Sequence, residues 1–380
     1  KFKKKSFKKF RKKNKKNICN FDDDSIINKL NSYNNLNFLK NSYVNNQDNI
    51  TSAINDQYFY GTEGNNIYEF GLGFDVIDYS YLPISISLVR GGTVDKGVLG
   101  TDTFLDFYDK IIATDKSNDW LDGFSNGGFI ADLDINLSKG TLDINNLPGL
   151  GSISSFIEKF ENISGSNNPD RLIGNSSNNT ILGNQGNDYI SGKRGKDNIF
   201  GGDGNDFLKG GRGNDKLFGG SGADLIEGGL GKDILNGGKG ADTYIYKKVK
   251  DSRLINKKNL YGVDWIQDFN TNEDKIYFSE AKEKQTFMDL GELNYLSAKS
   301  INKAIREESC EDFNTLCFNI TSSNKTYLAI NGLGLGFQDK NDLLLEITGY
   351  KGALENINVI TSEEFNNSNL SIWSTLYLYK

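Results

Sequence analysis

Residues 165–245 read GSNNPDRLI GNSSNNTIL GNQGNDYIS GKRGKDNIF GGDGNDFLK GGRGNDKLF GGSGADLIE GGLGKDILN GGKGADTYI, nine consecutive nonapeptides without an insertion. Position one is always glycine and position four is usually glycine. Position six is aspartate in every nonapeptide except the second, which has Asn179. Position eight is always apolar or aromatic. A fixed period kept through nine units predicts a solenoid of stacked repeats rather than a disordered glycine-rich linker.

Glycine and strand geometry together predict the local structure of each nonapeptide. Glycines at positions one, two and four allow left-handed dihedrals and close approach of backbone to backbone, so the first six residues are expected to form a turn. Positions seven to nine are expected to form a short strand. Its middle residue, at position eight, faces the core, and both neighbours face water because side chains alternate along a strand.

The nonapeptide resembles the RTX, or hemolysin-type, calcium-binding repeat. This resemblance implies an all-β fold, a parallel right-handed β-roll in which two nonapeptides complete one turn, followed here by a β-rich C-terminal cap. Repeats n and n+2 then stack along one flank. One flank carries Asp170, Asp188, Asp206, Asp224 and Asp242, and the other carries Asn179, Asp197, Asp215 and Asp233.

Stacked carboxylates need a cation. Neighbouring strands lie about 4.7 Å apart, so successive acids on one flank repel each other unless they are neutralised. Calcium takes six to eight oxygen ligands, which two carboxylates and several turn carbonyls supply. The resemblance implies carbonyl ligands from positions two and four. Each space between two successive position-six residues on one flank, called a gap below, would hold one ion, which gives four gaps on the first flank and three on the second. These carbonyls belong to Gly186, Gly195, Gly202, Gly204, Gly211, Gly213, Gly220, Gly222, Gly229, Gly231, Gly238 and Gly240.

Calcium binding of this kind acts on folding. Extracellular modules bind calcium with a Kd of roughly 10⁻⁴–10⁻³ M, so millimolar calcium stabilises each site by about 1.4 kcal/mol. About seven sites then contribute about 10 kcal/mol, comparable with the stability of a whole domain. The repeat is therefore expected to be largely unfolded without calcium, and the gap that contains Asn179 is expected to bind calcium most weakly.

Composition excludes several classes of function. The chain has no histidine, which removes histidine zinc sites, Ser-His-Asp triads and Cys-His dyads. Residues 1–16 hold eleven Lys or Arg, leaving 33 basic against 50 acidic residues, and such an acidic body argues against nucleic acid as a partner. No apolar run is long enough to span a membrane. Cys310 and Cys317 are either a disulfide pair or ordinary packing cysteines.

The flanking sequence divides the chain into four regions. Residues 1–56 form a basic head and an Asn-rich segment, disordered or partly helical, and residues 246–380 form a C-terminal β domain. Residues 57–164 are expected to be a degenerate, interrupted β-roll before the regular one at 165–245. Two degenerate nonapeptides place Asn66 and Asp75 at position six, and a unit of about 50 residues occurs twice, aligning Asp119 with Asp170. Asp75 and Asp119 are thus weaker ligand candidates.

The region after the repeat resembles the C-terminal part of serralysin-type secreted proteases, through GADTYIY (240–246), VDWIQDF (263–269) and EDKIYFS (273–279). That resemblance implies type I export, which is consistent with the expectation that the sequence has no conventional N-terminal signal peptide. The tail SIWSTLYLYK (371–380) departs from the serralysin ending. Thr361–Phe365 is expected to form a short capping helix.

These observations favour a non-enzymatic, extracellular, secreted or surface-associated calcium-binding protein that folds when it meets calcium. The alternative is the C-terminal portion of a secreted serralysin-like metalloprotease or other hydrolase whose catalytic domain is absent here, since the HExxH motif needs histidine. Within 281–380, the acids Glu307, Glu308, Glu311 and Asp312 fit a solvated face better than a carboxylate-pair hydrolase. A third possibility is a surface that is adhesive or binds ice or glycans, but no ladder of threonines at the strand positions supports it.

Overall fold

The structure is a computed structural model that describes residues 49–50, 58–68, 73–89, 93–104, 108–116, 118–123, 132–147, 151–252, 262–281, 287–307, 315–331, 337, 342–360 and 362–368. All of them belong to one compact unit, residues 45–380. The basic head, Cys19, Cys310 and the tail 371–380 lie outside the described residues. Within the described part, no helix is long and apolar enough to cross a membrane.

Two sheets hold the described strands. The first, sheet A, has the strand order β1-β3-β7-β6-β5-β9-β13-β15-β17-β19-β21-β23-β28-β27-β26-β25. Its strands are β1 (Asn49–Ile50), β3 (Ile67–Tyr68), β5 (Ser87–Val89), β6 (Thr93–Asp95), β7 (Thr101–Phe104), β9 (Trp120–Asp122), β13 (Asn162–Ser164), β15 (Thr180–Gln185), β17 (Asn198–Asp203), β19 (Lys216–Ser221), β21 (Ile234–Lys239), β23 (Asp264–Ile266), β25 (Phe287–Leu293), β26 (Thr315–Ile320), β27 (Lys325–Asn331) and β28 (Asp342–Glu346).

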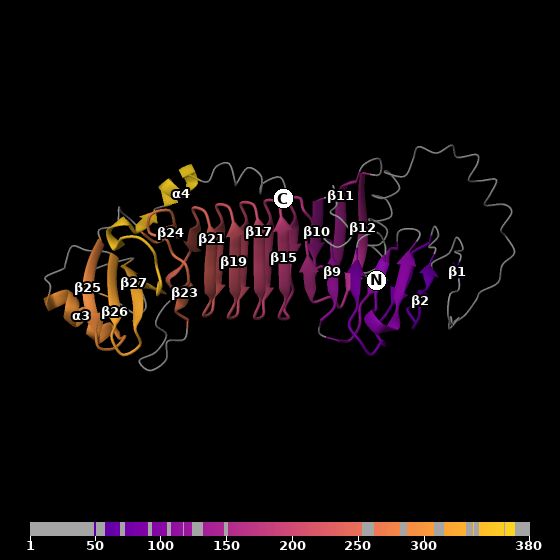
Figure 1. Ribbon diagram of the computed structural model, residues 1–380, viewed down its shortest axis with the longest axis horizontal. Helices are drawn as coiled ribbons and strands as arrows, with labels where there is room; N and C mark the ends of the chain where they lie inside the picture. Colours follow the sequence, from indigo (N-terminus) through magenta and orange to yellow (C-terminus); the bar gives the residue numbers. More distant parts are fainter. Residues whose placement is uncertain are drawn as a thin grey trace, which may run out of the picture. The chain divides into compact units, whose positions relative to one another are not determined.

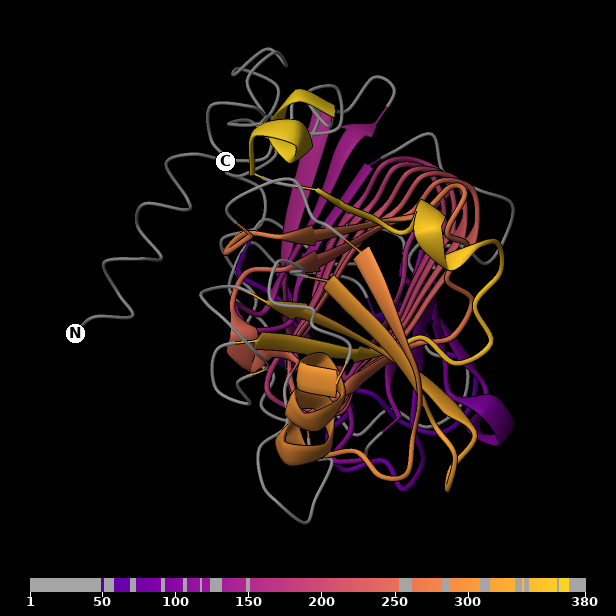
Figure 2. The same ribbon diagram turned by 90° about the vertical axis from the view of Figure 1, so that its left-hand side faces the viewer.

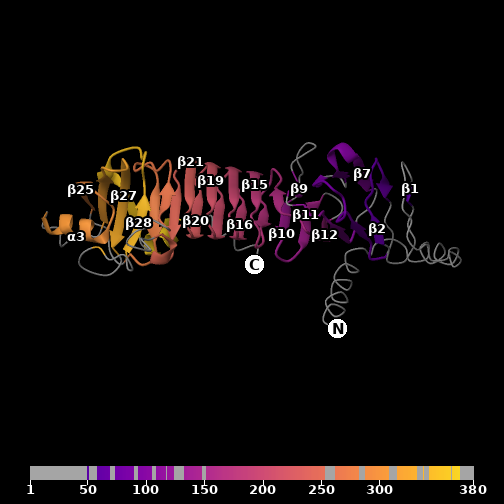
Figure 3. The ribbon, with the colours of Figure 1, turned by 90° about the horizontal axis from the view of Figure 1, so that it is seen from below.

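The second sheet, sheet B, has the order β2-β4-β8-β12-β11-β10-β14-β16-β18-β20-β22-β24-β29. Its strands are β2 (Tyr58–Tyr60), β4 (Val76–Asp78), β8 (Lys110–Ile112), β10 (Asp132–Asn136), β11 (Thr141–Leu147), β12 (Gly151–Glu158), β14 (Arg171–Ile173), β16 (Tyr189–Arg194), β18 (Phe207–Arg212), β20 (Leu225–Leu230), β22 (Thr243–Tyr246), β24 (Lys275–Phe278) and β29 (Asn358–Ile360). Figure 3 shows the alternation in the regular repeat, with β15, β19 and β21 in one layer and β16 and β20 in the other.

The regular repeat is a parallel β-roll, as predicted. Successive nonapeptides alternate between the sheets, so each strand pairs in parallel with the strand two repeats later: Phe207 faces Leu225 in β18 and β20, and Ile199 faces Leu217 in β17 and β19. Figure 1 shows β17 and β19 side by side, and in Figure 2 the successive coils lie behind one another.

The strands are longer than the three residues predicted. From β15 to β21 each strand runs for six residues, from position seven to position three of the next nonapeptide. Glycine does not end the strand, because the glycines of positions one and two continue the parallel ladder, as in the pairing of Lys193 with Gly211. Only positions four to six are left to make the turn.

The prediction that position-one glycines adopt left-handed dihedrals was wrong. Positive φ values occur at positions two and four, for example 121° at Gly202 and 140° at Gly204. Position one is glycine for a different reason. A Cβ on Gly201 would lie 2.3 Å from Oδ2 of Asp206 and 2.6 Å from the carbonyl oxygen of Gly219. The first glycine therefore makes room for the acid of its own nonapeptide.

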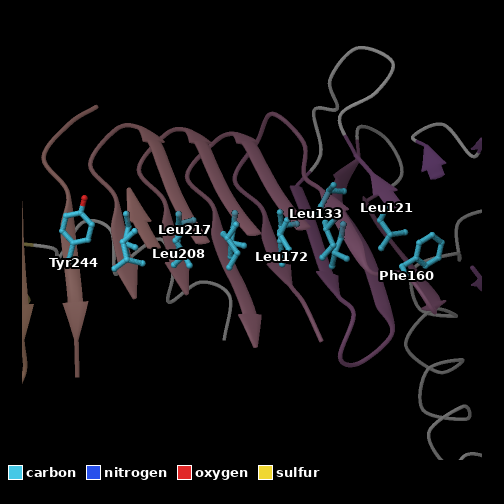
Figure 4. Packing of buried hydrophobic residues seen from close by; sticks show 14 of the residues in the cluster. Leu121, Leu133, Phe160, Leu172, Leu208, Leu217 and Tyr244 are labelled. Atoms are coloured by element: carbon cyan, nitrogen blue, oxygen red, sulfur yellow. The ribbon is translucent and has the colours of Figure 1, made fainter. Parts of the chain in front are cut away.

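The core of the roll is a row of side chains from position eight. All nine of these residues are fully buried between the two sheets, and they continue into Leu121, Leu133 and Phe160 upstream (Figure 4). Each nonapeptide contributes a single inward side chain, so this core is thin. Stability then depends heavily on what happens in the turns.

The prediction that positions seven and nine face water holds only in part. In sheet B, Phe207, Leu225 and Ile245 are also buried, and they form a second apolar cluster with Ile360 and Phe365. Phe365 belongs to helix α4 (Ser362–Ser368) and stacks on Tyr277 with ring centroids 4.2 Å apart. A helix was expected at 361–365, and it covers part of the outer face of sheet B.

Upstream of the regular repeat, the same two sheets continue but antiparallel hairpins interrupt them. The strands β5, β6 and β7 form one such insertion in sheet A, and β10, β11 and β12 form another in sheet B. The 3₁₀ helix η1 (Gly97–Leu99) lies between β6 and β7.

Downstream, sheet A ends in β25–β28. The predicted closing strands are β27 and β28, which pair antiparallel. Helix α3 (Ala298–Glu307) packs on this region through Ile301 and Ile305, and Cys317 of β26 is a buried free thiol. The remaining short elements are η2 (Val249–Asp251) and η3 (Leu354–Asn356).

Candidate calcium site

The position-six residues all lie at the same point of the coil, immediately before a strand, and all are buried. The exposed fraction of these nine side chains is at most 2%. The topology brings them together as predicted, with Asp188, Asp206 and Asp224 preceding successive strands of sheet B and Asp197, Asp215 and Asp233 preceding strands of sheet A. Full burial of an unpaired carboxylate is strongly unfavourable, so each acid needs compensation.

One carboxylate oxygen of each acid is compensated by backbone. The N–H of Asp188 donates to Oδ1 of Asp206 at 2.8 Å, and the N–H of Asp206 donates to Oδ1 of Asp224 at 2.8 Å. The same bond repeats on the other flank, where the N–H of Asp197 donates to Oδ1 of Asp215 at 2.9 Å. Each aspartate is thus tied to the coil on either side.

In six of the eight position-six acids, the second carboxylate oxygen has no such partner. Among the described residues, a buried Oδ2 without a hydrogen bond occurs in Asp188, Asp197, Asp206, Asp215, Asp224, Asp233 and Asp264. A series of orphaned, buried, hard oxygens along two flanks is the donor set that calcium prefers.

The other oxygens at this place are backbone carbonyls. A Cβ on Gly204 would lie 1.7 Å from the carbonyl oxygen of Gly186, and one on Gly213 would lie 1.5 Å from that of Gly195. Position-four carbonyls thus point at the next coil of the same flank. No group of three or more His, Cys, Asp or Glu side chains converges in the part of the chain described. A bound metal must therefore complete its ligand shell with carbonyls or water.

Burial changes the proton affinity of these acids. Desolvation raises the pKa of Asp206 and of Asp224 to about 7, and that of Asp215 to about 6. In Asp188, desolvation and the neighbouring charges of Asp206 and Asp170 raise the pKa to about 9. The position-six acids that follow one another along one flank form an aspartate ladder. Near neutral pH this ladder is partly protonated when no metal is bound, and a divalent cation competes with those protons.

Two positions differ from the rest. Asn179 uses its Nδ2 to donate to the carbonyl oxygen of Glu161 at 2.6 Å, and its Oδ1 accepts from the N–H of Asn175 at 2.9 Å. Asp170 accepts from the N–H of Leu133 through Oδ1 at 2.7 Å and from the N–H of Ser166 through Oδ2 at 2.6 Å. Their oxygens are satisfied by the protein, which sets the first coils apart from those that follow.

The ladder also extends beyond the nine nonapeptides. The N–H of Asp233 donates to Oδ1 of Asp264 at 2.9 Å, and that of Asp242 donates to Oδ1 of Asp274 at 3.0 Å. Sequence reasoning missed both acids because 31 and 32 residues replace the usual spacing of 18. The motif was present, since Asp264-Trp265-Ile266 and Asp274-Lys275-Ile276 repeat the acid, variable and apolar residues of positions six to eight. Asp242 is therefore not the end of its ladder.

The weaker candidates upstream are buried as well. The N–H of Asp75 donates to Oδ2 of Asp109 at 2.9 Å. Asp119 accepts from the N–H of Ile86 at 2.6 Å and from the hydroxyl of Thr114 at 2.8 Å. These contacts match those that Asp170 makes with Leu133 and Ser166, so the two sequence units with aligned Asp119 and Asp170 have the same local structure. Hydroxyl and amide donors occupy the oxygens of Asp119.

Comparison with known families agrees with this geometry. Four overlapping copies of the RTX calcium-binding nonapeptide repeat match at 164–199, 182–217, 192–226 and 209–244. Residues 164–244 are RTX calcium-binding repeats. They form a β-roll of calcium-binding repeats.

Two solved structures match the chain at low sequence identity. The solution structure of the AlgE6R2 subunit of the Azotobacter vinelandii mannuronan C5-epimerase matches with 20% identity and a TM-score of 0.26, over 53% of this chain and 93% of that one. The extracellular lipase LipA of Serratia marcescens matches with 13% identity and a TM-score of 0.17, over 84% of this chain and 40% of that one. The chain thus spans less than half of the lipase. Comparison with curated proteins returned no match.

Proposed function

We propose that this chain is an extracellular protein whose β-roll folds when it binds calcium, and that its role is structural or at a surface rather than catalytic. The observation that carries the proposal is the row of buried aspartates whose Oδ2 atoms lack a hydrogen-bond partner among the described residues. Such a row is destabilising by itself and becomes stabilising when a divalent cation sits in each gap.

The ligand set in each gap follows from the coil. Oδ atoms of two successive aspartates on one flank, for example Asp206 and Asp224, would bind the ion together with position-two and position-four carbonyls, such as those of Gly202 and Gly204. Calcium supplies the positive charge that removes the repulsion between these acids. The thin core of one side chain per nonapeptide makes the fold depend on this charge balance.

Calcium availability gives the proposal its biological meaning. With a Kd of roughly 10⁻⁴–10⁻³ M per site, micromolar calcium leaves the acids uncompensated and millimolar calcium fills the sites. The chain would then leave the cell unfolded and fold outside. The resemblance of residues 240–279 to the segment that follows the β-roll in serralysin-type proteases supports type I export.

Circular dichroism tests the proposal directly. We expect a large gain of β-structure when calcium-free protein receives about 10 mM calcium, tenfold above the weakest expected Kd. Magnesium at the same concentration serves as the control, because its octahedral geometry and tightly held water suit these carbonyl-rich gaps poorly. A spectrum that is the same in excess chelator and in calcium would exclude calcium-driven folding.

A further inference from the structure

The first degenerate nonapeptide, GTEGNNIYE (61–69), reproduces the turn of the regular repeat. Gly64 stands at position four with φ of 90°, and Asn66 stands at position six. The N–H of Asn66 donates to Oδ1 of Asp102 at 3.2 Å, and Ile67 pairs with Thr103 in the parallel ladder of β3 and β7. Asp102 therefore stands to Asn66 as Asp224 stands to Asp206.

A lysine occupies the gap between these two coils. Lys96 lies between β6 and η1, and its side chain is completely buried. Its Nζ donates to the carbonyl oxygen of Thr62 at 2.6 Å and to that of Gly64 at 2.8 Å, and it forms an ion pair with Oδ1 of Asp102. These three oxygens come from position two, position four and the acid of the next coil, which are the ligand positions of a regular gap.

We infer that the ammonium group of Lys96 takes the place of a calcium ion in this coil. The charges agree with this substitution. A regular gap has two carboxylates for a divalent ion, whereas here position six is the neutral Asn66 and Asp102 is the single acid facing one positive charge. The three oxygens match the three N–H donors of an ammonium group.

The second carboxylate oxygen of Asp102 also has a partner within the protein. It accepts a hydrogen bond from the hydroxyl of Tyr79 at 2.7 Å, whereas the equivalent Oδ2 of Asp206 or Asp224 lacks a partner among the described residues. A Cβ on Gly61 would lie 1.9 Å from the ring of Tyr79, so here the position-one glycine makes room for tyrosine instead of aspartate. This coil carries its own cation, and its acid is satisfied without metal.

The inference goes beyond calcium-driven folding, and it uses the proposed function only in taking calcium as the ion of the regular gaps. Equilibrium dialysis of the full chain with calcium counts the ions bound per molecule. We expect Asn66→Asp combined with Lys96→Ala to bind one ion more than the wild type, because the introduced carboxylate and that of Asp102 then face an open gap. Asn66→Asp alone, which keeps the lysine, should gain none. The same count in the wild type and the double variant, or a gain in Asn66→Asp alone, would overturn the inference.

Lys116→Ala is the matched control, since Lys116 is an exposed lysine of the same part of the chain. It should bind the same number of ions as the wild type. The wild-type count itself tests whether the regular coils bind calcium at all, so the two proposals fail separately.

Hydrogen exchange in the wild type covers the case in which a variant does not fold. As free calcium is lowered stepwise, peptides from 61–68 and 93–104 should stay protected at calcium concentrations at least tenfold below those at which peptides from 183–240 lose protection. Loss of protection in both regions at the same free calcium would contradict a built-in cation.

Discussion

The backbone N–H of Asp206 donates to Oδ1 of Asp224 at 2.8 Å, while Oδ2 of Asp224 has no hydrogen-bond partner among the described residues. The two acids are thereby held in adjacent coils with one oxygen engaged and one available. This arrangement places charge where only a cation or a proton can balance it. The stability of the roll should therefore respond to calcium, to pH and to the number of carboxylates, in directions that can be measured separately.

Replacing one ladder acid by its isosteric amide should have opposite effects with and without calcium. In Asp206→Asn the amide oxygen still accepts from Asp188, but the buried charge is gone. Without calcium, the free energy of unfolding should rise because a raised-pKa acid no longer has to be buried. With calcium it should fall by about 3 kcal/mol, since two gaps lose a ligand at about 1.4 kcal/mol each. Urea unfolding in calcium measures the fall, and the β-structure that circular dichroism detects in chelator measures the rise.

Asp203→Asn is the control for that experiment. Asp203 is an exposed acid at position three of the same nonapeptide, and its replacement makes the same change in net charge. We expect a change below about 0.5 kcal/mol in either condition. A fall with calcium as large as that of Asp206→Asn would attribute the effect to net charge instead of the ladder.

The position of an acid along its ladder should set the calcium affinity lost when it is truncated. Asp206 and Asp242 both have an acid in the coil before and after them, because Asp274 continues the ladder. Asp206→Ala and Asp242→Ala should thus lose similar affinity. Asp274→Ala should lose less, since Asp274 faces one gap of this ladder and its Oδ2 already accepts from the N–H of Asn270. Isothermal titration with calcium ranks the three, and a smaller loss for Asp242→Ala than for Asp274→Ala would contradict the extended ladder.

Calcium-free protein should become less stable as the pH rises. The pKa of the ladder acids is raised from 3.8 to between about 6 and about 9, as in Asp215 and Asp188. A raised pKa in the folded state means that the folded chain binds more protons than the unfolded one at pH values between 3.8 and the raised pKa. Its stabilising effect is complete below about pH 4 and is lost as the pH rises through 6 to 9.

The measurement is the β-structure that circular dichroism detects in calcium-free protein at pH 4.5, 6 and 8, which should fall in that order. Calcium should reverse the trend, because the ion binds the deprotonated carboxylates and its affinity rises with pH. A β-structure content that rises with pH in the absence of calcium would show that the ladder acids are ionised and compensated in some other way.

Asn179→Asp should convert the weakest gap into a regular one. The new carboxylate would face the carbonyl oxygen of Glu161, to which the amide of Asn179 now donates at 2.6 Å. Without calcium this contact becomes repulsive, and we expect the free energy of unfolding to fall by about 1–3 kcal/mol. With calcium the same oxygens bind the ion, so the variant should bind calcium more tightly than the wild type. Tighter binding without any loss in chelator would contradict this account of the gap.

Position-one glycines should not tolerate alanine, although their dihedrals are ordinary. In Gly201→Ala the new Cβ meets Oδ2 of Asp206 and the carbonyl oxygen of Gly219, both on well-packed parts of the coil. We expect the free energy of unfolding to fall by about 1–3 kcal/mol and calcium to bind more weakly, because the carboxylate of Asp206 must move.

Gly291→Ala separates this effect from backbone strain. Gly291 has φ of 66° and nothing within 4 Å of a built Cβ, so the substitution tests the left-handed dihedral alone. It should cost about 1 kcal/mol and leave calcium affinity unchanged. Thermal unfolding and calcium titration of both variants distinguish the two causes, and unchanged calcium affinity in Gly201→Ala would refute the steric coupling to Asp206.

The sequence alone determined the coil. A period of nine with glycine, aspartate and one apolar residue in phase permits few structures, since only a stacked solenoid buries every position-eight side chain and brings every second acid together. The sequence therefore predicts which acids are neighbours from Asp188 to Asp242, because they follow one another at a uniform spacing of 18 residues.

Only the tertiary structure decided where the ladders continue and how each end is neutralised. Asp264, Asp274 and Asp102 join through insertions of irregular length, and Lys96 reaches its gap from a hairpin about 30 residues away in the chain. A periodic pattern cannot locate such partners, because the register of an insertion is set by packing against the existing coil and not by residue spacing. The packing of the insertions therefore decides whether a gap is open to a free calcium ion or filled by the ammonium group of a lysine.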